Sequence, residues 1–578
     1  MRNLGPCFPA TIPFRISPVL GILRRFPVGS VPAIFIGGGG SGCRTGIRNA
    51  DKKRHTCVFS LSMSGCHGDS RVPVGTIETR TLAPVATLGY AVDCLVSAVS
   101  ELSSISPPSS GIIRLEVPIK QEIKGIEWLH AQSQLLPSFY FSGQRKRGNS
   151  GQFIDSINNG NRSLNGSVGC DLVSVAGVGA AVYFKHVHPF SFDDWRSIKR
   201  FLSKSCPRIR AYGAIRFDPK ADISKEWEAF GSFYFMVPQV ELNEFEGSSL
   251  LAVYVAWDND LSWEWKKAID SLKATLNQIN VHIIKLRNEV PKSAILSTVL
   301  HTPNVECWNV AVTKALQMIN NSSSALTKVV LARSSRMCAS TDINPIAWLA
   351  CLQADSGNAY QFCLQPSDGS TFIGNTPEQL FHRKQLNISS EALAGTRARC
   401  SERALDHEIE LDLLASPKDN LEFTIVRDSI RRKLEAVCNL VMVDPQKAVR
   451  KLSRVQHLFA KLKGSLRSED DEFDVLSSLH PSPAVCGFPT EEAHLLIAET
   501  ESFDRGMYAG PVGWFGGDEA EFAVGIRSAL VKKGLGALVY AGTGIVEGSN
   551  PSSEWEELDL KISQFSKLLT LDGHLVVR

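Results

Sequence analysis

Four acidic residues in the second half of the chain fall into two couples, and each couple has the spacing of one helix face. Asp419 and Glu422 are three residues apart, and so are Glu554 and Glu557. Residues three apart on a helix project from the same side. Two such couples facing one another would make an all-oxygen site suited to Mg²⁺, which takes one or two carboxylates and keeps some waters. Each couple alone is more typical of a solvated helix face.

A lysine and a glutamate supply candidates for proton transfer. Lys328 opens the apolar run Lys328–Arg333, and Glu378 follows a Gly/Pro turn in Phe372–Leu380. A lysine whose side chain enters a cleft can act as a base, and loops after strand ends commonly carry catalytic groups. The plainer interpretations are a solvated lysine at a strand edge and a glutamate in the first turn of a helix, after a proline.

A third group of residues is suited to an anion. Arg527 closes the run Phe522–Arg527, which we expect to be a strand, and Ala541–Gly544 is a Gly-rich turn that can bring backbone amides close to a ligand. Lys561 lies one helical turn beyond Glu557. Arginine and exposed amides are suited to a small carboxylate. Together the three groups predict a cleft for a small anionic substrate with Mg²⁺, one base and one acid.

The elements that must position these groups follow from hydrophobic periodicity. Helices are expected at Thr81–Leu102, Asp193–Ser203, Leu261–Leu286, Val305–Ile319, Asp406–Cys438 (interrupted near Pro417) and Ser553–Leu569. Strands are expected at Gly111–Pro118, Phe139–Phe141, Val182–Phe184, Gly231–Val237, Leu250–Ala256, Thr327–Ser334, Gln361–Leu364, Thr371–Gly374, Phe522–Leu530 and Ala537–Thr543. The mixture predicts an α+β fold of layered antiparallel sheets flanked by helices, not a doubly wound sheet.

Composition excludes several classes of protein. The 578 residues are 43% hydrophobic and 21% charged, which is typical of a globular chain. Apolar runs such as Val31–Ile36 are far shorter than the roughly 20 residues of a membrane span. The 14 cysteines contain no C-x-x-C pair, so neither a zinc ribbon nor a dithiol redox motif is expected. Residues 76–578 carry 52 basic and 57 acidic residues, and this net negative body argues against nucleic acid as a partner.

The amino terminus has a different composition. Residues 1–50 contain six arginines and no acidic residue, and residues 1–75 carry a net charge of +8. An arginine-rich, acid-poor start is typical of an organelle transit peptide, and a tail with no targeting role is the alternative. We expect the segment 1–79 to be a transit peptide, 80–300 to be a more divergent amino-terminal part of the fold, and 301–572 to be the catalytic domain.

The motifs of the second half resemble those of one enzyme family, the chorismate-utilising enzymes, which include the anthranilate, aminodeoxychorismate, isochorismate and salicylate synthases. The matching runs are Lys328–Arg333, Gly374–Glu378, Leu393–Arg397, Ser416–Glu422, His480–Ala484, Phe503–Gly513, Ala541–Ile545 and Ser553–Glu557. The amino-terminal half is looser, although Ala211–Arg216 and Phe230–Phe235 are also similar to the isochorismate synthases. The resemblance implies the fold of the anthranilate synthase large subunit and, with plant members the most similar, a plastid stroma location.

The resemblance also implies roles. Chorismate loses its C4 hydroxyl while a nucleophile enters at C2, and by position Lys328 is the water-activating base and Glu378 the acid. Glu422 and Glu557 match direct Mg²⁺ ligands, and Asp419 and Glu554 match outer carboxylates that hold its waters. The positions that match substrate contacts are Gly395, Thr396, His480, Arg527, Gly542 and Lys561.

Two positions separate branches of the family. Amine-adding members usually carry Gln where Lys328 stands, and the aminodeoxychorismate enzymes place a nucleophilic lysine where Ala394 stands. The residues here therefore favour water addition, the isochorismate synthase reaction, as a step toward salicylate or phylloquinone. One departure is Phe423, where bacterial members usually have His, and it puts metal affinity in doubt. Ser482 in place of the usual Thr is a smaller change.

Two alternatives remain open from the sequence. A salicylate synthase has the same lysine and then expels pyruvate, and a non-catalytic chorismate-binding regulatory protein would not need the intact acid and base. The resemblance and the composition imply chorismate as the small-molecule partner, with no nucleic acid, no membrane and no glutamine amidotransferase subunit, and a monomer.

Overall fold

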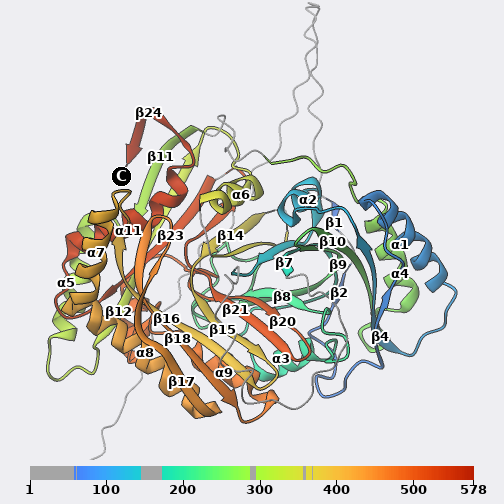
Figure 1. The fold of residues 1–578 in the computed structure, drawn as a ribbon, viewed down its shortest axis with the longest axis horizontal. Helices are drawn as coiled ribbons and strands as arrows, with labels where there is room; N and C mark the ends of the chain where they lie inside the picture. The colour runs from blue at the N-terminus through green and yellow to red at the C-terminus, as the bar shows by residue number, and fades with distance from the viewer. Residues whose placement is uncertain are drawn as a thin grey trace, which may run out of the picture. The chain divides into compact units, whose positions relative to one another are not determined.

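The β-branched and aromatic runs of the sequence form long, mostly antiparallel strands that pair across the two halves of the chain (Figure 1). The structure is a computed structural model that describes residues 58–59, 62–144, 172–286, 295–355, 359–367, 369–534 and 536–577. All of these residues belong to one unit, His55–Arg578. The first 57 residues, on which most of the predicted transit peptide falls, lie outside the described part.

Helices separate runs of one to four strands along the described chain. The helices are α1 (Leu88–Leu102), α2 (Gly125–Ala131), α3 (Phe192–Lys199), α4 (Trp265–Leu276), α5 (Val305–Ile319), α6 (Pro345–Asp355), α7 (Arg403–Ala415), α8 (Pro417–Val437), α9 (Glu472–Leu479), α10 (Thr490–Thr500) and α11 (Pro551–Ser566). The strands before residue 290 are β1 (Val58–Phe59), β2 (Met63–Ser64), β3 (Thr76–Thr81), β4 (Ser110–Ile119), β5 (Leu135–Leu136), β6 (Ser138–Ser142), β7 (Leu172–His186), β8 (Ala211–Ile215), β9 (Phe233–Phe245) and β10 (Ser248–Asp258). The later strands are β11 (Ile295–Thr302), β12 (Lys328–Ala339), β13 (Tyr360–Gln365), β14 (Ser370–Thr376), β15 (Gln379–Lys384), β16 (Asn387–Ala398), β17 (Cys438–Lys451), β18 (Val455–Leu466), β19 (Gly487–Phe488), β20 (Pro511–Phe515), β21 (Glu519–Val524), β22 (Ser528–Lys532), β23 (Gly536–Ile545) and β24 (Thr570–Val577).

Two long runs of paired strands diverge from β9. One continues through β7, β6, β13, β14, β22, β23, β12 and β11 to β24, and the other through β8, β20, β21, β15, β16 and β18 to β17. The β6–β13 and β8–β20 pairings each join a strand before residue 300 to a strand after it. The predicted boundary at residue 300 therefore does not separate two sheets.

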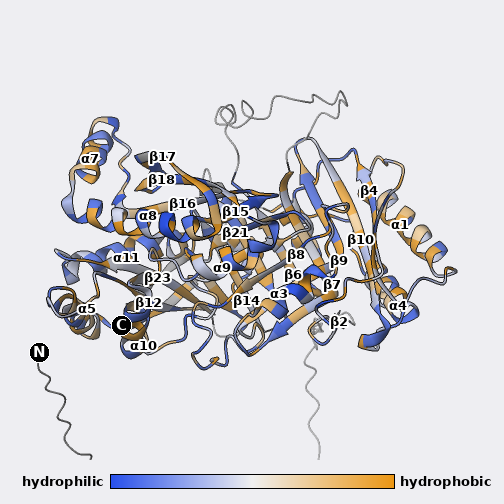
Figure 2. Ribbon diagram, turned by 90° about the horizontal axis from the view of Figure 1, so that it is seen from below, coloured by the Kyte–Doolittle hydropathy of each residue, from blue (hydrophilic) through white to orange (hydrophobic). Residues whose placement is uncertain are grey.

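Helices cover the outer faces of these strands. The buried side of α1 (Leu88, Ala91, Leu95 and Val99 among its residues) and α4 pack against β4 and β10, and α8 and α11 pack against β16 and β23. Figure 2 shows apolar residues on these strands and both apolar and polar residues along α1. Such one-sided burial is what an amphipathic helix on a sheet requires. Among the residues the structure describes, no helix is long and apolar enough to cross a membrane.

The aromatic core joins the two halves. Phe235 on β9 lies 5.1 Å, between ring centroids, from Phe515 on β20, and Phe515 lies 4.8 Å from Phe522 on β21. None of the three rings is exposed to solvent. Aromatic pairs at these separations stabilise a fold beyond the effect of the apolar area that they remove from water. The strands that carry the candidate site are thus supported by residues from both halves.

The sequence-based elements agree with the structure in type and differ at some ends. The α+β fold of antiparallel strands and flanking helices is confirmed, and the bounds predicted for α5 are those observed. The helix predicted over Asp406–Cys438 is two helices, separated at Ser416. The prediction of a single strand over Phe522–Leu530 was wrong, because β21 ends at Val524 and β22 begins at Ser528. Folded structure also begins before residue 80, since β3 pairs with β4.

Candidate active site

Both acidic couples lie in the first two turns of helices whose starts are defined by the sequence, with Asp419 and Glu554 in the first turn. Ser416 caps α8 by accepting a hydrogen bond from the Asp419 amide, and Asn550 caps α11 by accepting from the amides of Ser552 and Ser553. A proline occupies the first turn of each helix, where its missing N–H costs nothing. The positive end of the helix dipole favours carboxylates there.

Every one of the four carboxylates has a cation beside it. Lys328 Nζ lies 3.1 Å from Glu422 Oε1, and Lys561 Nζ lies 2.6 Å from Glu557 Oε1. Arg397 Nη2 lies 2.8 Å from Asp419 Oδ2, and Lys418 pairs with Glu554. Buried carboxylates are stable only with such partners. The four carboxylates therefore concentrate negative charge in one place, and the cations beside them balance it.

Lys418 shows that the two couples face one another. Although burial disfavours its charge, the carboxylates of Glu554, Glu422 and Glu557 raise the pKa of the Lys418 amine. Lys418 stands on α8, while Glu554 and Glu557 stand on α11. Burial, with the charge of Glu557 adding to it, raises the pKa of Glu554. These mutual effects require carboxylates from the two helices within electrostatic reach of each other.

A cavity of about 70 Å³ lies beside the carboxylates. Eight of the residues predicted as site residues line it: Glu378, Gly395, Thr396, Glu422, Arg527, Gly542, Glu557 and Lys561. Apolar side chains such as Val330, Leu393 and Tyr508 complete the wall. The arrangement of a few charged groups on an apolar wall is typical of a small-molecule site. Lys328, Asp419 and Glu554 are buried behind this wall, in contact with its charged groups or with their neighbours.

Gly544 keeps the floor of this region open. A Cβ atom at this position would lie 2.2 Å from Glu422 Oε1 and 2.9 Å from Lys328 Cε. No side chain larger than hydrogen fits without displacing both groups. The prediction of a turn at Ala541–Gly544 was wrong, because these residues lie within strand β23, paired with β12. Gly544 instead has a steric role toward the carboxylate and the lysine.

Glu378 is held as an acid. It lies between β14 and β15, not at a helix start, and its carbonyl accepts a hydrogen bond from the Val524 amide. The preceding carbonyl, that of Pro377, accepts from Arg450 Nη1 at 3.0 Å and from Gln144 Nε2 at 2.9 Å. Burial raises the pKa of the Glu378 carboxyl to about 8, although Lys328 opposes the shift. Glu378 is therefore protonated at neutral pH and can donate a proton.

This burial makes stability depend on pH. The ordinary pKa of 4.5 is raised to about 8 on folding, so the stabilising effect of the protonated carboxyl is complete below pH 4.5 and is lost as pH rises to about 8. Glu378→Gln removes the cost of an ionised buried carboxylate, and we expect it to raise the melting temperature at pH 9 by about 2 °C or more, with little change at pH 5. Thermal unfolding of the wild type and the variant in the presence of a chelator measures this difference. Equal melting temperatures of the two proteins at pH 9 would contradict the prediction.

The structure does not bring His480 to the cavity. Its Nε2 lies 3.1 Å from the carbonyl oxygen of Arg216, and burial lowers the pKa of the ring to about 4. The cavity histidine is His457 on β18, which the sequence analysis missed. The signal that could have found it is a single histidine in the apolar strand pattern Val455–Ala460. Such a residue on the buried face of a strand needs a polar partner.

His457 supports Arg527. Its Nδ1 donates to the Gly395 carbonyl at 2.9 Å, which leaves Nε2 to accept from Arg527 Nη2 at 3.5 Å. Burial, reinforced by Arg527, lowers the pKa of His457 to about 3, so the ring is neutral. Arg527 lies between β21 and β22 with φ of +49°, and not in a strand as predicted. This left-handed backbone directs the guanidinium into the cavity wall.

A pair of variants distinguishes the two histidines. His457→Gln removes the ring that orients Arg527, so we expect KM for an anionic substrate to rise by roughly tenfold, the cost of about one hydrogen bond to a charged group. His480 lies outside the cavity, so we expect His480→Gln to lower the melting temperature and to leave KM unchanged. Steady-state kinetics on both variants measures the difference. A rise in KM for His480→Gln alone would reverse the assignment.

Phe423 belongs to the hydrophobic core. Its side chain is buried in the hydrophobic core, and it is not among the described residues that line the cavity. The guanidinium of Arg427 lies 5.7 Å from its ring centroid. Phe423 therefore contributes packing to α8, and nothing in its contacts connects it to a metal.

Comparison with known proteins identifies the family. The family model described as chorismate binding enzyme matches residues 170–570, which are more than half of the chain. The chain belongs to this family. It is 58% identical to an isochorismate synthase 2, chloroplastic, of Arabidopsis thaliana over 89% of this chain and 91% of the relative. It is also 56% identical to a chloroplastic isochorismate synthase of Catharanthus roseus over 90% and 92%.

Solved structures agree with this placement. The isochorismate synthase MenF of Escherichia coli superposes with a TM-score of 0.69 at 25% identity, over 84% of this chain and all of the other. Component I of the anthranilate synthase of Streptococcus pneumoniae has a TM-score of 0.56 at 19% identity, over 72% and 97%. The second likeness concerns the fold alone, and it confirms the predicted architecture.

Proposed function

We propose that this chain converts chorismate to isochorismate by adding water at C2 while the C4 hydroxyl leaves. The observation that carries the proposal is the pairing, at one cavity, of a protonated carboxyl on Glu378 with a buried lysine, Lys328, whose charge acts on it. The identities to isochorismate synthases over about nine-tenths of the chain support it. One water enters and one leaves, so the reaction is an isomerisation.

Lys328 acts as the base in this proposal. Its amine is fully buried, and its 3.1 Å contact with Glu422 lacks hydrogen-bond geometry. In its neutral form the amine can take a proton from a water positioned at C2 of the ring, since a protonated lysine cannot act as a base. Glu378 delivers a proton to the C4 hydroxyl, which then departs as water. Proton transfer by positioned groups contributes about 10²–10⁴ to the rate.

The remaining cavity residues hold the carboxylates of chorismate. Arg527 and Lys561 supply positive charge, and the strand segments at Gly395 and Thr396 on β16 and at Gly542 on β23 supply backbone amides. Lys561 is fixed for this task because its Nζ donates to the Gly542 carbonyl at 2.7 Å. His457 orients Arg527 and, being neutral, adds no charge of its own. A cavity wall of this kind orients the ring between the base and the acid.

The donor set fits Mg²⁺. Four carboxylates from two helix starts give oxygen ligands of the type that this ion prefers, and three lysines and an arginine neutralise them in its absence. Glu422 and Glu557 would bind the ion directly, and Asp419 and Glu554 would hold its waters. Bound there, it would neutralise the ring carboxylate of chorismate. We place the protein in the plastid stroma as a monomer without an amidotransferase subunit, with the product used for salicylate or phylloquinone. The transit peptide would end before the paired strands β2 and β3, and so be shorter than the expected 1–79.

Product analysis tests the proposal. Purified protein lacking residues 1–57 is incubated with chorismate, with and without Mg²⁺, and the products are separated by chromatography. We expect isochorismate with Mg²⁺ and neither salicylate nor pyruvate. Salicylate with an equal amount of pyruvate would instead identify a salicylate synthase. No turnover by folded protein would identify a chorismate-binding regulatory protein.

A further inference from the structure

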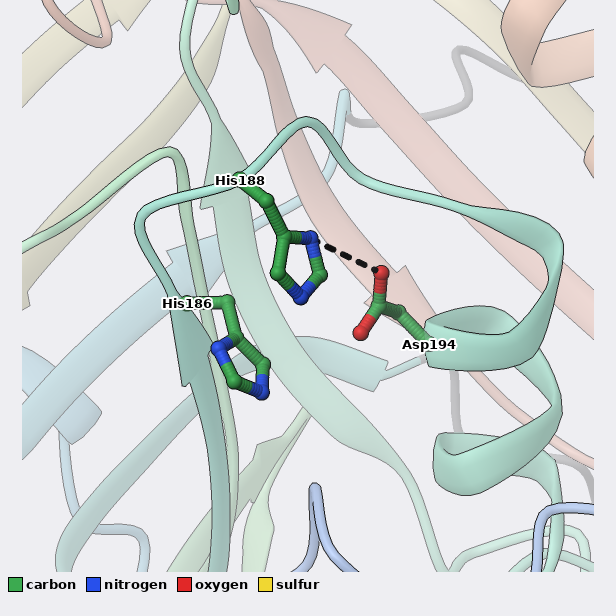
Figure 3. A group of neighbouring side chains, drawn as sticks. All are labelled: His186, His188 and Asp194. Carbon is green, nitrogen blue, oxygen red and sulfur yellow. Dashed lines mark ion pairs between the residues drawn. The ribbon is translucent and has the colours of Figure 1, made fainter.

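A second cluster of metal-ligating side chains lies where β7 ends and α3 begins (Figure 3). His186 is the last residue of β7, His188 follows two positions later, and Asp194 stands in the first turn of α3. One donor atom from each residue lies within 4.8 Å of the other two. None of the three is among the described residues that line the cavity. The cluster is thus separate from the carboxylate site.

The hydrogen bonds around the cluster leave suitable donor atoms. His188 Nδ1 lies 2.9 Å from the Pro189 carbonyl, to which it donates, so the lone pair of Nε2 is available. Histidines that bind metals usually donate their other ring nitrogen to such a carbonyl. The amide and hydroxyl of Ser191 both donate to Asp194 Oδ2, at 2.8 and 2.6 Å. These capping bonds do not use Oδ1, and Figure 3 shows that oxygen on the side of the two rings.

The charges of the cluster also suit a cation. Burial, together with His188 and His67, lowers the pKa of His186. The rings of His186 and His188 are stacked, with centroids 4.1 Å apart, and Asp194 Oδ2 lies 3.7 Å from His188 Nδ1. Two imidazole nitrogens and one carboxylate oxygen would supply three ligands to a divalent ion, and a bound water can supply the fourth.

We propose that His186, His188 and Asp194 bind a divalent transition-metal ion of the zinc class. Two imidazoles and a carboxylate suit such ions, whereas Mg²⁺ prefers oxygen ligands only. Donor atoms around tetrahedral zinc are about 3.4 Å apart, given bonds of about 2.0–2.1 Å. Because the two rings are stacked, their in-plane lone pairs do not yet converge, and one ring must rotate for both to bind the same ion. His188, whose side chain is 47% exposed, is free to make this rotation. The ion would fasten the end of β7 to the start of α3.

Titration with Co²⁺ tests the proposal on the protein lacking residues 1–57, with excess Mg²⁺ present to occupy the carboxylate site. We expect one Co²⁺ per chain with the visible absorption of a four-coordinate site, displaced by Zn²⁺. His188→Ala is expected to weaken Co²⁺ binding by at least about tenfold. Zn²⁺ should also raise the melting temperature of the wild type more than that of His188→Ala.

His407→Ala is the matched control. It removes another exposed histidine beside a carboxylate, since His407 Nδ1 lies 3.3 Å from Glu410 Oε2, and we expect Co²⁺ binding to be unchanged. Because the ring of His188 is half exposed, its removal leaves the core intact, and the variant should fold. The proposal is contradicted if Co²⁺ does not bind, if His188→Ala binds it as tightly as the wild type, or if both variants weaken binding equally.

Discussion

Replacing Lys328 with glutamine is expected to lower kcat for isochorismate formation by about 10²–10⁴, the usual contribution of a positioned base. Glutamine keeps most of the volume of the side chain but cannot accept the proton of water. The lysine is fully buried, its amine lies 3.1 Å from Glu422 Oε1, and it is close enough to Glu378 to affect the pKa of that carboxyl. No other described lysine takes this position, so rescue by a neighbour is not expected. Product formation from chorismate with saturating Mg²⁺ measures the loss.

Lys314→Gln is the control for this variant. Lys314 is an exposed lysine on α5 that pairs with Glu499 on α10, and its loss should leave kcat unchanged. Circular dichroism and the melting temperature establish that Lys328→Gln is folded. A folded Lys328→Gln protein with wild-type kcat would remove Lys328 from the mechanism.

Loss of the metal is expected to have the second large effect. A divalent ion at a developing charge contributes several kcal/mol to transition-state stabilisation, so chelation of Mg²⁺ should lower the rate by roughly 10³ or more. Glu422→Gln and Glu557→Gln each remove one negative charge from a proposed ligand. We expect each to raise the Mg²⁺ concentration needed for half-maximal activity by at least about tenfold. Activity as a function of Mg²⁺ concentration measures both effects.

A matched variant tests whether the loss of any one carboxylate charge changes the Mg²⁺ dependence. Glu499→Gln removes an exposed carboxylate that pairs with Lys314 on the surface, and its Mg²⁺ dependence should equal that of the wild type. Full activity of the wild type in a chelator would show that the carboxylates serve structure and not a metal.

The features of the site that could be predicted from the sequence are local ones. The spacing of Asp419 and Glu422, after a capping serine and a proline, defines both their helix and their shared face. The same holds for Glu554 and Glu557 on α11. Periodicity alone placed α5 at its observed bounds because its apolar residues repeat without interruption.

The features that could not be predicted depend on contacts between distant segments. His457 reaches the cavity because β18 pairs with β16, which brings its ring to the Gly395 carbonyl. The motif histidine, His480, instead meets a carbonyl 264 positions away in sequence. The pKa of Glu378 is raised by burial under strands from several segments, and no short motif contains that information. The position of Arg527 depends on its left-handed backbone conformation, and the strand-like sequence around it gives no sign of that conformation.

Isotope labelling tests the central claim, that water activated at this cavity supplies the new hydroxyl group. The protein is incubated with chorismate and Mg²⁺ in ¹⁸O-labelled water, and isochorismate is analysed by mass spectrometry at early conversion. We predict one ¹⁸O atom per product molecule, located at the C2 hydroxyl. Isochorismate without the label would mean that the hydroxyl migrates within the substrate, and the roles given to Lys328 and Glu378 would then be wrong.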